Sequence, residues 1–318
     1  MYDIVIIGGG PAGMTAALYA LRNNKSVLIL EKEAFGGQIA TSPRLENYPT
    51  IESISGSEWA DRLFEQITNL GAEFELEEVE SINKVDGVFH IKTNYAEHEA
   101  LTVIIANGVK PRKMGLPNED DLVGKGVSYC AVCDGPFYKG KEIYCDGPFY
   151  KGKEIYLIGD ANTALQYALL LGNYCPKIHM LTLFDKLFGD QILIDRVIQA
   201  ENIDIRHNLL LKKLEEENGS LVAIELEDTI TKEKVRFATD NCFIAIGQVP
   251  QNDFLKDLLK LDHGFIKTND LMETEIQGLY AAGDTRVKEN KQVITACSDG
   301  ATAAMSAVKY LNTLSSTL

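Results

Sequence analysis

The chain lacks the features that mark membrane proteins, nucleic-acid-binding proteins and disulfide-stabilised proteins. No apolar run in its 318 residues approaches the ~20 residues of a transmembrane helix. Basic residues are few: 31 Lys and Arg stand against 46 Asp and Glu, and the net charge of −15 argues against general binding to nucleic acid or anionic membranes. Six cysteines are too few for a disulfide scaffold. The first predicted strand begins at Tyr2 and leaves no room for a signal peptide, so we expect a cytoplasmic protein.

The composition and the pattern of apolar residues predict an α/β fold with two domains. Hydrophobic residues make up 45% of the chain and charged residues 24%, which is typical of a globular protein. Strand and helix patterns alternate, and segments 115–117 and 247–250 could carry the chain between domains. We expect two Rossmann-like, three-layer ββα nucleotide-binding domains, the second inserted into the first. Their predicted bounds are 1–115 with 247–318 for the first, and 116–246 for the second.

A glycine-rich loop, GGGPAG at residues 8–13, lies between an apolar strand pattern and a helical one. This context is the one that a dinucleotide-binding fingerprint requires. Gly8 permits the tight turn, Gly10 lets the backbone approach a pyrophosphate, and Gly13 allows close packing of helix on strand. Eighteen residues past Gly13, the next strand ends in Glu31, whose carboxylate suits the ribose hydroxyls of an adenine dinucleotide. The segment predicts a dinucleotide site; a glycine-rich turn without a ligand is the alternative.

A second strand–turn–helix segment, GDANTA at residues 159–164, keeps the topology but not the chemistry of such a site. Ala161 puts a methyl group where the backbone would touch pyrophosphate, and Asp160 adds a negative charge beside an anion site. The following strand leads into TLFDKLF at residues 182–188, which offers no arginine cluster for a 2′-phosphate. We interpret Lys186 as a solvated surface charge. The fold of a nucleotide domain is therefore predicted without its ligand site.

Between the two loops stands a CxxC motif, Cys130 to Cys133, followed by Asp134. Two residues between cysteines allow a small reversible disulfide ring, and the motif can depress a thiol pKa. Asp134 is a candidate proton shuttle. The alternative is half of a zinc site, but such a site needs a second pair of ligands. The other cysteines are isolated and are interpreted as structural or incidental thiols, so no metal site is expected: Cys145, Cys175, Cys242 and Cys297.

Residues 133–144, CDGPFYKGKEIY, recur without change at 145–156. A solenoid needs about three or more repeats, so one duplication does not indicate a repeat fold. The first copy completes the CxxC motif, and the second supplies the strand before Gly159. One copy is surplus to a compact domain, and we interpret it as a slippage event or an artefact of the recorded sequence. An intact-mass measurement decides between the two.

Taken together, these segments resemble the low-molecular-weight thioredoxin reductase family of flavoproteins over nearly the full chain. The matching motifs are GGGPAG at 8–13 with Glu31, GGQI at 36–39, ENYP at 46–49, CAVCDGPF at 130–137, AGD at 282–284 and KQVITA at 291–296. The resemblance implies FAD in the discontinuous domain and a homodimer. The residues implied to bind FAD are Gly8, Gly10, Pro11, Ala12, Gly13, Glu31, Gly37, Gln38, Asn47, Gly283, Asp284, Gln292 and Val293. It also implies that Cys133 faces the flavin and that Cys130 attacks the disulfide of thioredoxin.

The sequence departs from the family pattern at the nicotinamide-nucleotide site. The NADPH-dependent members have a GGGNSA-like loop, here GDANTA, and a His-Arg-Arg stretch with a further Arg. Thr182, Leu183 and Phe184 stand at the His-Arg-Arg stretch, and Phe188 at the further Arg. These losses argue against NADPH as the electron donor. Among known relatives, the chain is most similar to the ferredoxin-dependent flavin thioredoxin reductases.

We therefore expect an enzyme that passes electrons from reduced ferredoxin through FAD to the Cys130–Cys133 disulfide and on to thioredoxin. Ferredoxins are usually acidic, so docking would need a cationic face; Lys110, Arg112 and Lys113 are candidates, with solvated surface charges as the alternative. Two other interpretations stay open: an NAD(P)H-dependent thioredoxin reductase with an atypical nucleotide site, and a flavin redox sensor without turnover. A ferredoxin–NADP reductase is disfavoured because it needs the missing nucleotide site and has no use for CxxC.

Overall fold

The computed structural model describes residues 1–42, 45–129, 131 and 154–315 of the chain. These residues divide into two compact units. One consists of Met1–Lys110 with Val249–Leu318, and the other of Pro111–Gln248. The chain passes between the units at β7 (Val109–Pro111) and β16 (Gln248–Pro250), which together form a two-stranded sheet.

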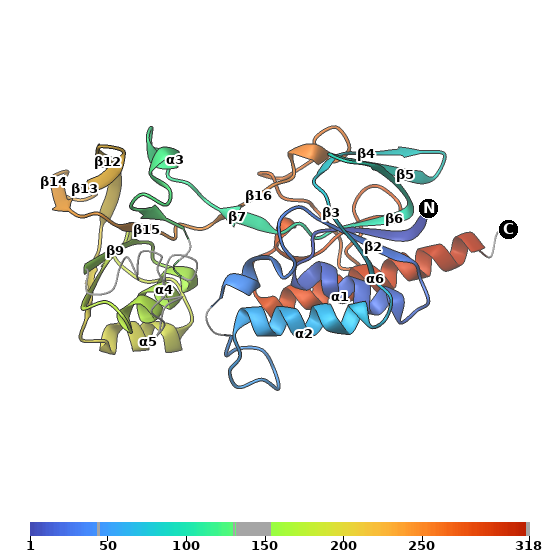
Figure 1. The fold of residues 1–318 in the computed structure, drawn as a ribbon, viewed down its shortest axis with the longest axis horizontal. Coiled ribbons are helices and arrows are strands. Elements are labelled where there is room, and N and C mark those ends of the chain that lie inside the picture. Colours follow the sequence, from blue (N-terminus) through green and yellow to red (C-terminus); the bar gives the residue numbers. More distant parts are fainter. Residues whose placement is uncertain (43–44, 130, 132–153, 316–318) are drawn as a thin grey trace. The chain divides into compact units, whose positions relative to one another are not determined.

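The first unit is built on a seven-stranded sheet in the order β3-β2-β1-β6-β5-β4, with β17 also paired to β6. Strands β1, β2, β3, β6 and β17 pair in parallel, whereas β4 and β5 join antiparallel. The strands are β1 (Tyr2–Ile7), β2 (Val27–Glu31), β3 (Glu73–Leu76), β4 (Val79–Val85), β5 (Val88–Thr93), β6 (Glu97–Ile105) and β17 (Leu279–Ala281). Three helices lie against one face of this sheet, as Figure 1 shows: α1 (Pro11–Leu21), α2 (Gly56–Thr68) and α6 (Val293–Ser315).

Strand β1 explains how the first unit forms two cores. Its near-continuous apolar run is typical of a parallel strand that is buried on both faces. Ile4 and Ile6 pack with the helices on one face, and Val5 and Ile7 pack with the β4–β5 hairpin and the segment around η2 (Asp253–Leu255) on the other. Helices α1 and α6 pack closely at Gly300. A Cβ on this residue of α6 would lie 2.1 Å from the carbonyl oxygen of Ala12 in α1.

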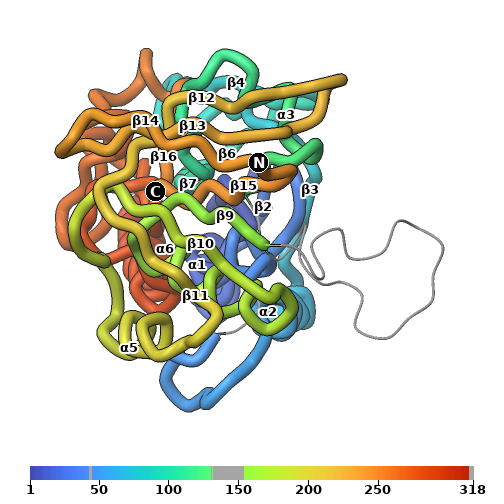
Figure 2. The backbone as a smooth tube through the Cα atoms, turned by 90° about the vertical axis from the view of Figure 1, so that its left-hand side faces the viewer, coloured from blue at the N-terminus to red at the C-terminus, as the bar shows by residue number. Residues whose placement is uncertain are grey.

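The second unit has three layers, with a sheet in the middle and covering elements on both of its faces. Its central sheet is parallel, in the order β11-β10-β9-β15-β8, and Figure 2 shows β9, β10 and β11 in succession. The parallel strands are β8 (Val127–Ser128), β9 (Glu154–Ile158), β10 (Lys177–Leu181), β11 (Ile203–Arg206) and β15 (Cys242–Ile244). An antiparallel sheet covers one face, and helices cover the other. The covering elements are β12 (Leu209–Glu217), β13 (Ser220–Asp228), β14 (Lys234–Ala238), α4 (Asn162–Gly172) and α5 (Gln191–Gln199); a short helix, α3 (Glu119–Leu122), precedes β8.

Strand β9 is formed by the end of the second copy of the sequence repeat together with the apolar residues that follow it. Ile155 and Leu157 pack with the helices, and Tyr156 and Ile158 pack with the antiparallel sheet. The second copy thus supplies this strand, as the sequence predicted. Among the residues that the structure describes, none of the helices has the length and apolarity needed to cross a membrane.

Candidate functional site

The first glycine loop has the backbone that only glycine tolerates. Gly8 has φ +107°, and a Cβ there would lie 2.4 Å from the carbonyl oxygen of Ala106. A Cβ on Gly13 would lie 1.9 Å from the carbonyl oxygen of Gly8. Helix α1 starts at Pro11 with Gly10 as its N-cap residue, and no side chain caps this end of the helix. The N-terminus of α1 is thus arranged to receive an anion.

The carboxylate of Glu31 is held beside this loop. Its Oε2 accepts the backbone N–H of Gly9 at 2.8 Å, and its Oε1 accepts that of Glu33 at 3.0 Å. The loop is closed from the other side by Gly36, whose N–H donates to the carbonyl oxygen of Gly9 at 2.8 Å. An acceptor next to the glycine turn and at the end of β2 is the arrangement that binds ribose hydroxyls.

A further predicted segment, residues 36–39, lies beside the loop. Gly37, with φ +58°, begins η1 (Gly37–Thr41), and a Cβ there would lie 3.1 Å from the Cα of Gly10. The next residue, Gln38, donates a side-chain hydrogen bond to the carbonyl oxygen of Val109. The structure therefore brings Gly37 against the glycine turn and Gln38 against Val109.

A second meeting joins residues that are far apart in the sequence. The amide Nδ2 of Asn47 donates to Oε1 of Gln292 at 3.1 Å. Gln292 directly precedes Val293, where α6 begins. The segments that the family resemblance assigned to the flavin thus touch one another.

The Gly283–Asp284 pair lies where β17 ends, in η3 (Gly283–Thr285). Gly283 has φ +78°, and a Cβ there would lie 2.9 Å from the Cβ of Ala12 at the start of α1. Oδ1 of Asp284 is buried and has no hydrogen-bond partner among the residues that the structure describes. Burial raises the pKa of Asp284, although the charges of Lys288 and Lys291 oppose this shift. A buried carboxylate oxygen without a partner is the feature expected of a residue that receives a hydroxyl from a ligand.

These observations fit FAD. A dinucleotide needs N–H groups for its pyrophosphate, an acceptor for its ribose and acceptors along its ribityl chain. The N-terminus of α1 offers the first, Glu31 the second, and Asp284 an uncommitted acceptor for the third. All of them belong to the first unit.

The second glycine turn has a similar backbone. Gly159 has φ +147°, and a Cβ there would lie 2.3 Å from the carbonyl oxygen of Ala245. Helix α4 follows with Ala161 as its N-cap residue, again without a side-chain cap. The loop after β10, however, lies against this turn: the N–H of Phe188 donates to the carbonyl oxygen of Asp160 at 2.6 Å, and Ala161 forms a β-bridge with Phe188.

The side chains around the second turn are acidic and apolar. Burial raises the pKa of Asp160. Leu183, Phe184 and Phe188 are 40%, 51% and 42% exposed, at the positions where the family resemblance implies arginines in NADPH-dependent members. Lys186 is exposed, and its Nζ lies 5.0 Å from the ring centroid of Phe188. This surface offers little to a 2′-phosphate.

The predicted redox residues Cys130, Cys133 and Asp134, and Cys145 of the repeat, lie outside the described residues. The other three cysteines are Cys175, Cys242 and Cys297, and all are buried. Burial raises the pKa of Cys175 to about 11 and that of Cys242 to about 12, which disfavours the reactive thiolate. In the described part of the chain, no group of three or more His, Cys, Asp or Glu side chains is arranged to hold a metal ion.

The candidate cations for donor docking are partly committed to acidic partners. Lys110 pairs with Glu33 at 2.5 Å, and Lys113 pairs with Asp120 at 2.6 Å. Such exposed pairs are typical of solvated surface charges. The charges of Lys110 and Lys113 are therefore compensated, and Arg112, the third candidate, is exposed.

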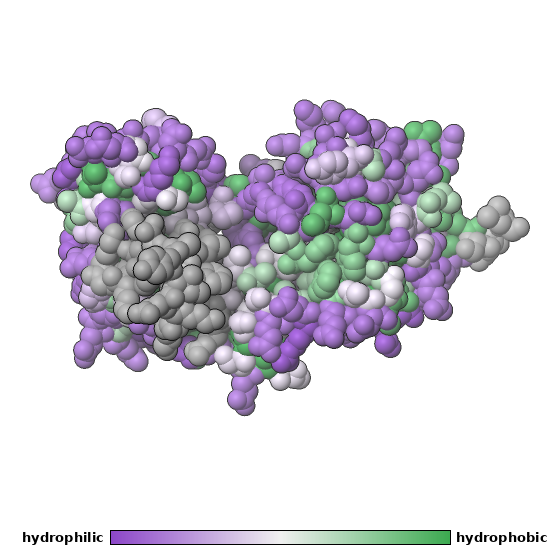
Figure 3. Space-filling view, viewed as in Figure 1, coloured by the Kyte–Doolittle hydropathy of each residue, from purple (hydrophilic) through white to green (hydrophobic). Residues whose placement is uncertain are grey.

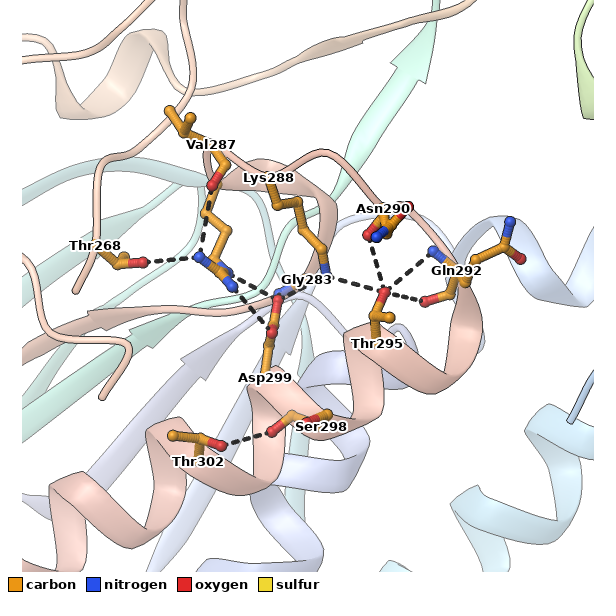
Figure 4. Close-up of polar contacts among 11 residues, drawn as sticks. Thr268, Gly283, Val287, Lys288, Asn290, Gln292, Thr295, Ser298, Asp299 and Thr302 are labelled. Carbon is orange, nitrogen blue, oxygen red and sulfur yellow. Dashed lines mark hydrogen bonds and ion pairs between the residues drawn. The ribbon is translucent and has the colours of Figure 1, made fainter. Parts of the chain in front are cut away.

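Two polar clusters were missed by sequence reasoning. Glu119 is 2% exposed, and it accepts the backbone N–H groups of Met114, Gly115 and Leu116 at 2.7, 2.6 and 3.0 Å. It also accepts the hydroxyl of Tyr129, the residue before the CxxC motif. The second cluster joins Asp299 of α6 to the loop after Asp284 (Figure 4). Its only sequence signal is a carboxylate in a helix of small residues.

Comparisons with known proteins show the family to which the chain is related. A family model described as pyridine nucleotide-disulphide oxidoreductase matches residues 2–300. The chain is 40% identical over 321 residues to a thioredoxin reductase of Bacillus subtilis (strain 168), covering 100% of this chain and 97% of that protein.

Two solved structures that resemble this one are also thioredoxin reductases. The structure is similar to Lactococcus lactis thioredoxin reductase, with a TM-score of 0.93 and 34% identity over 98% of this chain and 100% of that one. It is also similar to a ferredoxin-flavin thioredoxin reductase from Clostridium acetobutylicum, with a TM-score of 0.53 and 28% identity over 99% and 98% of the two chains. These matches confirm the predicted α/β fold with two Rossmann-like domains.

Proposed function

Because the chain belongs to the low-molecular-weight thioredoxin reductase family of FAD-binding disulfide oxidoreductases, we propose that it reduces thioredoxin with electrons from reduced ferredoxin. When bound, FAD accepts single electrons and delivers a pair to a disulfide. The family gives the oxidoreductase activity and the cofactor; the donor is the part that we add.

The observation that carries the choice of donor is the state of the second glycine turn. Asp160 places an acid beside the N-terminus of α4, and Leu183, Phe184 and Phe188 replace the arginines that a 2′-phosphate needs. The hydrogen bond from Phe188 to Asp160 keeps the loop against the turn. A one-electron protein donor needs no such site.

We assign FAD to the unit of residues 1–110 and 249–318. The backbone of residues 8–13, including Pro11 and Ala12, would hold the pyrophosphate, and Glu31 the ribose. Asp284, which follows Gly283, would accept a hydroxyl of the ribityl chain. The residues assigned to the flavin ring are Gly37, Gln38, Asn47, Gln292 and Val293.

We assign the thiol chemistry to the CxxC motif. Cys130, as the thiolate, attacks one sulfur of the thioredoxin disulfide; that bond breaks and a mixed disulfide forms. Cys133 then attacks the sulfur of Cys130, which releases dithiol thioredoxin and re-forms the Cys130–Cys133 disulfide. Asp134 is the candidate shuttle for the proton that is transferred in each turnover. When bound, the flavin would supply the electron pair that reopens the disulfide, and Cys133 would face it.

We also propose a homodimer that uses the surface of α1 and α6. Figure 3 shows an apolar area over these helices, and Tyr19 and Met305 are 41% and 46% exposed. A shallow hollow lies at the same helices; its lining residues are Asn23, Met305, Val308, Lys309, Asn312 and Thr313. Sedimentation equilibrium of the wild-type chain and of Met305→Glu tests this assignment.

A second candidate function is thioredoxin reduction with NADH or NADPH. The glycine turn at Gly159 and the uncapped N-terminus of α4 favour it, because both are the backbone features that bind a pyrophosphate. The matching family model also names a pyridine nucleotide.

The deciding experiment offers three donors to the same holoenzyme under anaerobic conditions. Reduced ferredoxin, NADPH and NADH are compared for bleaching of the flavin absorbance and for thioredoxin reduction. We expect ferredoxin alone to support both. Rapid bleaching by NADPH or NADH would replace ferredoxin with a pyridine nucleotide. Flavin reduction without any thioredoxin turnover, unchanged in Cys130→Ser, would instead favour a redox sensor.

A further inference from the structure

A buried ion cluster joins helix α6 to the loop that carries Asp284 (Figure 4). Oδ2 of Asp299 accepts the backbone N–H of Gly283 at 3.1 Å and the Nζ of Lys288 at 2.8 Å. Arg286 donates to both oxygens of Asp299, through Nε at 2.8 Å and Nη2 at 3.2 Å. The side chains of Asp299, Arg286 and Lys288 are 8%, 16% and 8% exposed. One carboxylate therefore compensates two cations that have little access to water.

The same loop is also held by hydrogen bonds to Asn252. Thr285, the residue after Asp284, donates its hydroxyl to Oδ1 of Asn252 at 3.0 Å. Asn252 is 2% exposed and donates its own amide to the carbonyl oxygen of Gly264 at 2.9 Å. Both neighbours of Asp284 are therefore held by buried partners, while Oδ1 of Asp284 has no hydrogen-bond partner in the described part of the chain.

Lys288 lies near both carboxylates, because its Nζ donates to the same oxygen of Asp299 that accepts the N–H of Gly283, the residue before Asp284. Its charge acts on Asp284 strongly enough to oppose the effect of burial on the pKa of that group, yet its Nζ is bonded to Asp299 and, at 3.1 Å, to the hydroxyl of Thr295. Burial of Asp299 is outweighed by the hydrogen bonds from Arg286 and Lys288, which hold the pKa of Asp299 below its usual value. Asp299 is thus charged at neutral pH and retains the lysine.

We propose that Asp299 is a positioning residue for FAD: by holding Lys288, it keeps the carboxylate of Asp284 uncommitted and able to accept a ribityl hydroxyl. Without Asp299, a buried ammonium would lose its partner, and an unpaired buried charge is strongly unfavourable. Lys288 would then pair with Asp284 and compete with the cofactor. The inference rests on the proposed role of Asp284 and does not depend on the electron donor.

The experiment compares FAD affinity in four variants and the wild-type chain. Apoprotein is titrated with FAD, and the dissociation constant is measured from quenching of flavin fluorescence; thermal unfolding of the apoprotein is recorded in parallel. Asp299→Asn should weaken FAD binding about tenfold or more, because the amide cannot compensate two cations. Lys288→Met alone should stay within about threefold of wild type, because Asp299 keeps its bonds to Gly283 and Arg286.

The double variant Asp299→Asn/Lys288→Met separates positioning from loss of structure. Removal of the competing ammonium should return the FAD dissociation constant to within about threefold of wild type and raise apoprotein stability above that of Asp299→Asn. A role that lies only in the bonds of Asp299 to Gly283 and Arg286, which the double variant also lacks, predicts no such recovery. The inference is overturned if Asp299→Asn binds FAD normally, or if the double variant binds FAD or folds no better than Asp299→Asn.

Asp284→Asn is the arm that tests the underlying assignment. If this variant binds FAD as well as wild type, the proposed contact between Asp284 and the cofactor is wrong. If Asp284→Asn weakens FAD binding but Asp299→Asn does not, the assignment of Asp284 stands and the role of Asp299 is rejected. The two failures therefore give different results.

Discussion

The turns at Gly8 and Gly159 have closely similar backbones but different surroundings. Each has a glycine with positive φ whose Cβ would meet a carbonyl oxygen of the neighbouring strand segment, and each leads into a helix without a side-chain cap. At the first turn an acceptor, Glu31, stands beside the loop. At the second, the loop after β10 donates a hydrogen bond back to the turn through Phe188.

This difference shows that the glycine fingerprint and the ligand site are separable. Positive φ and close packing against a strand are demands of the strand–turn–helix connection itself, and both units meet them. Ligand binding depends on what surrounds the turn. In the first unit that is a ribose acceptor and an uncommitted carboxylate at Asp284; in the second it is Asp160 with exposed Leu183 and Phe184.

The largest expected effect comes from adding a side chain to each turn. Gly13→Val should abolish FAD binding and lower the free energy of unfolding by more than about 3 kcal/mol, because its Cβ would lie 1.9 Å from a carbonyl oxygen. Gly159→Val should destabilise the chain through a similar clash at 2.3 Å, but the folded fraction should keep FAD. The flavin-to-protein absorbance ratio and thermal unfolding measure both effects. Loss of FAD from folded Gly159→Val would show that the second turn also serves the flavin.

A smaller effect is expected at the acceptor beside the first turn. Glu31→Gln should weaken FAD binding by about tenfold, because a hydrogen bond to a charged acceptor contributes about 1.5–3 kcal/mol. Glu33→Gln is the matched control: it removes an acid two residues away whose side chain is 65% exposed and paired with Lys110. Fluorescence titration of the two apoproteins should leave the control unchanged. Equal losses in both variants would assign the effect to general charge rather than to a ribose contact.

Local patterns in the sequence predicted the strands, turns and first-unit site because their physics is local. Each of these features is encoded within one segment. Ile4 and Val5 point to opposite buried faces of β1, Gly8 forms the turn after it, and Glu31 ends β2. The family resemblance implied that Asn47 and Gln292 each bind FAD, but their contact was not predicted, because 245 residues separate them.

Other features could not be predicted from local patterns. The hydrogen bond from Phe188 to Asp160 is made by backbone atoms, so no side-chain motif signals it. Asp299 meets Lys288 and Arg286 only because α6 packs beside the loop after β17, a tertiary relation. The cations Lys110 and Lys113 looked available for docking in the sequence, but their acidic partners became visible only in the fold.

The smallest expected effect is a pH-dependent loss of folding stability at the second turn. Burial raises the pKa of Asp160 in the folded chain above its value in the unfolded chain. The protonated form is therefore favoured by folding, and stability from this group is present below the unfolded pKa and is lost as the pH rises through the folded pKa.

Asp160→Asn should raise the free energy of unfolding at pH 7 by less than about 1 kcal/mol, with the gain disappearing in acid. Asp185→Asn, an exposed acid in the following loop, should show no such trend in thermal unfolding between pH 3 and pH 8, scanned in steps of about one unit. A stability gain at Asp160 that persists unchanged in acid would assign the effect to packing, and the acid would no longer distinguish the second turn from the first.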